Sequence, residues 1–248
     1  MIRAHLGEAI DIHGGGRDLV FPHHENERAQ SCCAYGGDFV RYWMHNAFID
    51  MDGEKMSKSL GNVRTVRELL ARFPGEVLRF ALLSAHYRSA LNFSGELLTS
   101  ARGTLDTFYG ALRRHVDVEP ATLNVSDSRV FLALLDDMNT PEAIATLHAA
   151  AGILNKSDDP QEVAMAKAEL TVAGRLLGIL DADPVAWFTD VVGKDGLAAE
   201  EIEALIEERT AAKASRDFQR ADQIRDVLGA QGVMLEDGPK GTQWRRRS

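Results

Sequence analysis

Residues 8–51, EAIDIHGGGRDLVFPHHENERAQSCCAYGGDFVRYWMHNAFIDM, decide the fold of this chain. The segment 8–16 predicts a short strand that ends in three glycines, which let a backbone turn sharply or approach a ligand. Pro22 suits the first turn of a helix, which we expect to end near Gly36 and Gly37. Aromatic and β-branched residues over 39–51 predict a second strand. This order of elements indicates part of an open α/β sheet.

The rest of the chain has mainly helical periodicity, without an internal repeat or a low-complexity tract. We therefore predict an α/β segment followed by an all-α body and a small mixed α/β end. The expected elements are helices over 66–73, 76–87 and 94–116, a helical hairpin or bundle over 126–181 with breaks near 141 and 157–160, helices from 198 and over 220–232, and a hairpin over 233–245.

Composition narrows the class of protein. The 248 residues carry a net charge of −9, and no apolar run reaches the roughly 18–20 residues that a membrane span needs. The only cysteines, Cys32 and Cys33, are adjacent and cannot form a disulfide framework, which favours a reducing compartment. We expect a cytoplasmic protein. Residues 210–248 hold eight Lys or Arg against five Asp or Glu, so this acidic chain has a basic end that can bind RNA, unless it is simply solvated.

His23 and Glu27 stand four residues apart, which places them on one face of a helix. An imidazole and a carboxylate at this spacing can share a zinc ion, but zinc usually takes four ligands. Cys32 and Cys33 lie five and six positions beyond Glu27 and do not converge with the pair. The pattern therefore indicates half of a metal site or, as an alternative, an ordinary surface pair.

The segment EKMSKSLGN, residues 54–62, places Lys55 and Lys58 in one polar loop. Two mobile ammonium groups can stabilise charge on a departing pyrophosphate. The alternative is an exposed loop without a ligand. The glycines at 14–16, with Asp18 two residues beyond, fit a nucleotide that the backbone approaches closely, and they fit a plain turn equally well.

In combination these segments are specific. DIHGGGRDLVFPHHENERAQS, YWMHNAF and EKMSKSLGN, in this order, resemble the class I cysteinyl-tRNA synthetases. RFALLSAHYRSALNFS resembles the region that follows the lysine loop in that family, and RDFQRADQIRDVLGAQGVMLEDGPKGTQWR resembles its anticodon-binding module. The resemblance implies the C-terminal part of a Rossmann-like catalytic domain with its lysine loop over 1–62, a connecting, stem-contact region over 63–115, a helical bundle over 116–190 and an anticodon-binding module over 191–248.

The resemblance also implies a reaction and the residues that take part in it. ATP, with Mg²⁺, would activate L-cysteine, and the cysteinyl group would then pass to tRNA. Lys58 would stabilise the transferring phosphates with help from Lys55, and zinc would distinguish the thiol of cysteine from the hydroxyl of serine. His23 and Glu27 would supply two of four zinc ligands. The residues implied to line the ATP and substrate pocket, with Lys58, are His13, Gly15, Asp18, His24 and His45.

At the C-terminal end, the resemblance implies five residues that contact the anticodon. An aromatic ring can stack on an unstacked base, and carboxylates can accept hydrogen bonds from base donors. The family often has arginine at the position of Lys213 and tryptophan at that of Phe218. The alternative for Asp222 and Arg225 is a helix ion pair at i,i+3. These implied contacts are Lys213, Phe218, Asp222, Arg225 and Asp237.

The chain departs from the family pattern in one respect. It has neither the histidine motif of the family's nucleotide-binding half nor the two cysteine zinc ligands. We therefore expect a C-terminal portion of the synthetase, a monomer that binds tRNA weakly and is inactive or nearly so alone. Two alternatives stay open: a cysteine ligase of mycothiol synthesis, which needs no anticodon module, and a non-catalytic tRNA-binding fragment.

Overall fold

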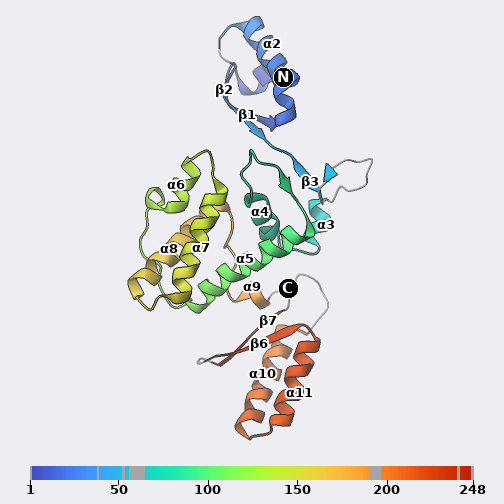
Figure 1. Ribbon diagram of the computed structural model, residues 1–248, viewed down its shortest axis with the longest axis vertical. Helices are drawn as coiled ribbons and strands as arrows, with labels where there is room; N and C mark the ends of the chain where they lie inside the picture. Colours follow the sequence, from blue (N-terminus) through green and yellow to red (C-terminus); the bar gives the residue numbers. More distant parts are fainter. Residues whose placement is uncertain are drawn as a thin grey trace.

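The computed structural model describes residues 2–37, 39–51, 54–55, 65–189, 197–238 and 241–246. Three parts follow one another along the long axis of the molecule (Figure 1). A small strand–helix–strand unit comes first, a helical body lies in the middle, and a two-helix module with a hairpin comes last. The predicted α/β segment, all-α body and mixed end are therefore confirmed.

The first part is built on two parallel strands, β1 (Ile10–Gly16) and β2 (Val40–Asn46). Helix α2 (Glu25–Tyr35) connects them, as the sequence predicts, and a short helix α1 (Ile2–Leu6) precedes them. The regular helix begins three residues later than predicted, because Phe21 has an extended backbone at φ −138°, a conformation favoured before proline. A short 3₁₀ turn (Arg17–Leu19) and a wide π-helical turn (Val20–His24) fill the interval.

A small three-stranded sheet joins this part to the body. Its order is β4 (Glu54–Lys55), β3 (Ile49–Met51), β5 (Leu91–Asn92), with β3 parallel to β5 and antiparallel to β4. Met51 is buried in the core of the body, so β3 is anchored by apolar packing as well as by its hydrogen bonds. Most of the lysine loop predicted over 54–62, namely residues 56–62, lies outside the described residues.

The body consists of helices whose apolar faces share one core. Leu105, Phe108 and Tyr109 of α5 and Leu147 of α7 are completely buried there. Thr65 caps α3 through a capping box with Glu68, and Ser94 caps α5. The helices are α3 (Val66–Leu70), α4 (Gly75–Leu83), α5 (Gly95–Arg114), α6 (Arg129–Leu135), α7 (Thr140–Lys156), α8 (Pro160–Leu177) and α9 (Ala186–Thr189), with a 3₁₀ turn at Val125–Asp127.

The last part has a core of its own. Helices α10 (Ala199–Ala214) and α11 (Phe218–Ala230) pack on a hairpin of β6 (Val233–Gly238) and β7 (Gly241–Arg246). The hairpin was predicted, although its tip at 239–240 lies outside the described residues. The buried core of this last part consists of Ile202, Ile206, Ile224, Leu228, Val233 and Trp244.

Within the described part of the chain, no helix combines the length and the apolar character that crossing a bilayer requires.

Candidate active site and nucleic-acid interface

His13 lies at the centre of the candidate active site, on β1 directly opposite Trp43 of β2. The two residues are register partners, and their rings stack with centroids 4.8 Å apart. The His13 side chain is largely buried, and its Nδ1 atom has no hydrogen-bond partner. Buried polar atoms in proteins are almost always paired, so this nitrogen has an open position for a ligand.

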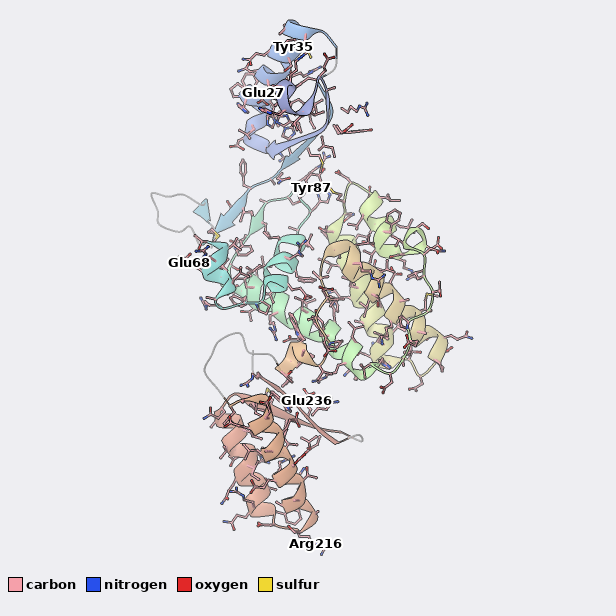
Figure 2. All side chains as sticks on the ribbon, turned by 180° about the vertical axis from the view of Figure 1, so that it is seen from behind. Glu27, Tyr35, Glu68, Tyr87, Arg216 and Glu236 are labelled. Carbon is pink, nitrogen blue, oxygen red and sulfur yellow. The ribbon has the colours of Figure 1, made fainter. Side chains whose placement is uncertain are left out.

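Glu27, in the first turn of α2, faces two histidines (Figure 2 shows Glu27 in the first part of the molecule). Its Oε2 atom lies 3.4 Å from Nε2 of His13, and its Oε1 atom lies 3.6 Å from Nε2 of His23. Oε2 is buried and makes no hydrogen bond. The predicted His23–Glu27 pair is therefore in place, and the fold adds His13 to it.

His24 and His45 complete the histidine cluster, with the ring centroids of His13 and His24 4.7 Å apart. Nδ1 of His24 lies 2.8 Å from Nε2 of His45, at the distance of a hydrogen bond. His24 is buried, and burial, followed by the neighbouring His13, lowers the pKa of its imidazole. Gly15 is required here, since a Cβ atom at this position would lie 2.8 Å from Cε1 of His24. The glycine thus lets the backbone of β1 approach this ring.

The donor atoms of this cluster suit a transition metal. Ligand atoms of His13, His24 and Glu27 lie within 4.8 Å of one another, and imidazole nitrogen with carboxylate oxygen is a donor set that zinc accepts. His23 is more exposed, and its Nε2 lies beside Glu27 rather than within this group. Neither Cys32 nor Cys33 belongs to the group that the described residues form.

Two further predicted residues, Asp18 and Lys55, are placed by the structure. Asp18 sits on the 3₁₀ turn, and its carboxylate folds back on Gly16, where an added Cβ would lie 2.5 Å from Oδ1. Lys55 belongs to the small sheet, where its backbone pairs with Asp50 of β3. Lys58 falls in the segment that the structure does not describe.

Asp237, predicted to contact the anticodon, is the hub of an ion-pair network. Its carboxylate accepts two hydrogen bonds from Arg209 at 2.9 and 3.0 Å, one from Lys213 at 2.9 Å and one from Thr242 at 2.6 Å. The Arg209 and Thr242 hydrogen bonds hold the pKa of this carboxyl group far below its usual range. Two predicted contacts, Lys213 and Asp237, thus lie together, with Arg209 buried beneath them.

The other predicted anticodon contacts lie on α11. Phe218, its first residue, has 64% of its surface exposed, so its ring is available for stacking. Asp222 and Arg225 form an ion pair at 3.2 Å, which is the i,i+3 arrangement that the sequence left open as an alternative.

Two residues of these sites escaped the sequence reasoning. One is Trp43, which stacks on His13. The only sequence signal for this contact is the position of Trp43 in a predicted strand. Arg209 stands four residues before Lys213 and therefore on the same face of α10, a spacing that could have marked the two as neighbours. Its contact with Asp237, however, joins residues 28 apart, and local spacing does not reveal that.

Comparisons with protein families agree with this architecture. The family model for the tRNA synthetases class I (C) catalytic domain matches residues 1–103. A DALR domain matches residues 129–181, and a cysteinyl-tRNA ligase anticodon binding domain matches residues 195–245. Together with the parallel strands and the histidine cluster, these matches define a protein of the class I tRNA synthetase type.

Individual relatives narrow the class. A cysteine–tRNA ligase of Saccharophagus degradans is 55% identical over 99% of this chain and 54% of its own length. One from Parvibaculum lavamentivorans is 53% identical over 99% of the chain and 53% of its own length. The chain belongs to the class I cysteinyl-tRNA synthetase family and matches its C-terminal portion. It spans about half the length of these relatives.

A solved structure supports the fold alone. The LeuRS of Agrobacterium radiobacter K84, in a ternary complex with tRNA and LeuAMS, superposes with a TM-score of 0.52. The superposition covers 68% of this chain and 25% of the LeuRS chain at 18% identity.

Proposed function

We propose that this chain serves in a cysteine–tRNA ligase, which uses ATP to activate L-cysteine and transfers the cysteinyl group to tRNA. The observation that carries the proposal is the His13–Glu27 cluster, with buried and unpaired donor atoms, in a chain 55% identical to a cysteine–tRNA ligase. We further propose that the protein is a cytoplasmic monomer.

The pocket residues fall into two groups in this proposal. His13, Gly15, Asp18, His24 and His45 line the space for ATP and cysteine at the end of β1. The cysteine carboxylate attacks the α-phosphate of ATP, the bond to the β-phosphate oxygen breaks, and pyrophosphate leaves with Mg²⁺. Lys55 and Lys58 stabilise the charge that builds on the phosphates, because preformed positive charge is most effective where negative charge develops.

Zinc belongs to this proposal because the donor set fits it. His23 and Glu27 would hold the ion as two of its ligands, and His13 lies beside the same carboxylate through its Nε2 atom, while its Nδ1 atom is unpaired. When bound, zinc would supply affinity for a thiol over a hydroxyl, since sulfur is a softer ligand than oxygen. His24 and His45 would orient the cluster through their hydrogen bond.

The C-terminal module would recognise the anticodon. Phe218 offers an exposed ring for a base, and Asp222 and Arg225 offer polar groups one turn further along α11. Lys213 would offer the N–H groups that its bond to Asp237 leaves over, and Asp237 would contact a base by exchanging one of its four hydrogen bonds within the network. We propose the corresponding division into a catalytic portion (1–62), a connecting region (63–115), a helical bundle (116–190) and an anticodon-binding module (191–248).

Cysteine-dependent ATP–pyrophosphate exchange tests this proposal. The chain is measured alone and mixed with the portion of the Saccharophagus degradans ligase that it does not match. We expect no exchange from the chain alone and exchange from the mixture, with a loss of about 10²–10³-fold when Lys58→Ala removes one charge-stabilising group. Exchange that does not depend on cysteine, or that is indifferent to Lys58, would overturn the assignment.

One observation favours a second function, tRNA binding without catalysis. The C-terminal module has an apolar core of its own and an exposed aromatic residue. If the chain binds tRNA but its mixture with the portion of the ligase never supports exchange, the second function is favoured.

A further inference from the structure

The turn between α10 and α11 ends the first helix with a Schellman motif. The backbone N–H of Arg216 donates to the carbonyl of Lys213 at 3.1 Å, and that of Asp217 donates to the carbonyl of Ala212 at 2.8 Å. Ser215 is the last residue with a right-handed backbone, and Arg216 follows with φ +63°. Arg216 therefore occupies the left-handed position that closes the helix.

Glycine is the usual residue at this position, because it has no Cβ to clash in a left-handed conformation. This module does use left-handed glycine at the end of α11, where Gly232 has φ +73°. At the end of α10 the sequence instead has a long cationic side chain, at a conformational cost. A non-glycine residue held in this region is a reason to look for a function of its side chain.

Arg216 also differs from the other cations of its module. Within residues 197–238 and 241–246, each other lysine or arginine has a polar partner, and Arg216 has none for its guanidinium group. The residue is exposed, and two positions further on stands the exposed ring of Phe218. Figure 2 shows Arg216 at the far end of the module, away from the body.

An unpaired guanidinium two residues from an exposed aromatic ring is a suitable surface for single-stranded RNA. The ring can stack on a base while the guanidinium forms hydrogen bonds to a phosphate oxygen of the same strand. We propose that Arg216 binds a backbone phosphate of the tRNA anticodon loop beside the base that stacks on Phe218. The inference rests on the proposed tRNA-binding function and adds a residue to it.

The substitution Arg216→Gly separates a binding role from a structural one. Glycine suits the backbone here, so the thermal unfolding midpoint should be unchanged or higher. The Kd of the full chain for tRNA should rise about fivefold, and the slope of log Kd against log salt should fall by about 0.7–0.9, as for one phosphate contact. Arg216→Lys keeps a positive charge and should retain most of the affinity.

Arg220→Gln is the matched control, because it removes a neighbouring arginine that is already paired with Glu208 at 2.8 Å. It should change the Kd less than about twofold. Equal losses in both variants would show a general charge effect and overturn the inference, as would unchanged affinity or a lower unfolding midpoint in Arg216→Gly. If the unsubstituted chain does not bind tRNA, the proposed function itself fails, and this inference fails with it.

Discussion

The first and last parts of the molecule are similar in size but differ in how they are stabilised. The described side chains buried in residues 2–51 are those of His24, Phe39 and Met51, and Met51 packs in the core of the body. The C-terminal module buries a compact apolar cluster, including Trp244 and Leu228, beneath its hairpin. In the first part, Nδ1 of His13 and Oε2 of Glu27 are buried without a hydrogen-bond partner, whereas the unpaired buried atoms described in the last part are Nε atoms of arginines that have a polar partner elsewhere.

The two parts differ in how much apolar packing supports their polar side chains. Parallel strands are usually covered on both faces, yet Ile12 of β1 is 60% exposed and Tyr42 of β2 is 68% exposed. The same two strands hold His13 and its unpaired nitrogen. The first part therefore holds its histidine cluster with little apolar packing, and the last part is built on a packed apolar core.

The largest effect should come from the core of the last part. Trp244→Ala removes a buried ring and the 2.6 Å hydrogen bond from its indole N–H to Glu203. We expect the free energy of unfolding of the module to fall by about 3–5 kcal/mol. Ile12→Ala, in the exposed first part, should cost less than about 0.5 kcal/mol. Hydrogen exchange of α10 and α11, compared with β1, measures both, and equal costs would contradict the comparison.

A second prediction concerns the carboxylate of Glu27 in the first part. Glu27→Ala removes the carboxylate that faces both His13 and His23. Zinc affinity should fall at least about 100-fold, because even partners outside the metal's own ligands contribute roughly 10–100-fold. The measurement is competition with a chromophoric chelator.

Substitution of His13 and His23 in turn identifies which of the two binds the ion. His23→Ala should weaken zinc binding more than His13→Ala if the predicted pair holds the ion, and the order should reverse if the buried group around His13 does. Unchanged zinc affinity in all three variants would show that the cluster is not a metal site.

A third, smaller effect should come from the ion-pair network of the last part. Asp237→Asn leaves the buried Arg209 without its carboxylate, so stability should fall by about 1–3 kcal/mol, with solvent screening at the half-exposed Asp237 favouring the low end. Because the folded-state pKa of Asp237 lies below the unfolded value of about 3.9, this stabilisation is present above about pH 4 and is lost as the pH falls.

Denaturation of both proteins at pH 7 and near pH 2 checks this prediction. The difference in stability between the unsubstituted chain and Asp237→Asn should narrow at the lower pH. A constant difference would show that the charge of Asp237 is not its source.

The smallest effect should appear where the last part touches the body. Arg113 of α5 donates to Glu236 of β6 at 2.7 Å, and Arg245 also contacts this carboxylate (Figure 2 shows Glu236 between the module and the body). Glu236 is half-exposed, so Glu236→Gln should cost only about 0.2–1 kcal/mol. Thermal unfolding in low and high salt measures it, and a loss that salt does not reduce would contradict an electrostatic origin.

Local sequence signals predicted the elements but not the contacts between them. The caps at Thr65 and Ser94 and the strand that ends at Gly16 follow from residue types, because their causes lie within a few positions. The contact between His13 and Glu27 depends on how α2 lies against β1. The spacing of residues along the chain does not reveal this arrangement.

The resemblance to a known family supplied candidate residues that physical patterns alone left open. It named His23 and Glu27 together, and it placed Asp237 among the anticodon contacts. It did not indicate that Asp237 is bound by Arg209 within the chain. A further feature without a sequence signal is the left-handed pair Asp137 and Met138, with φ 51° and 54°, where Asp137 accepts a hydrogen bond from Tyr87.

Selective tRNA binding tests the central claim most directly. The Kd of the chain is measured by filter binding for a tRNA that accepts cysteine and for one that does not, at the same salt concentration. We predict at least about tenfold tighter binding of the cysteine tRNA, equivalent to about 1.4 kcal/mol, with the preference reduced by Phe218→Ala. Equal affinity for the two tRNAs, or a preference that Phe218→Ala leaves intact, would contradict the account.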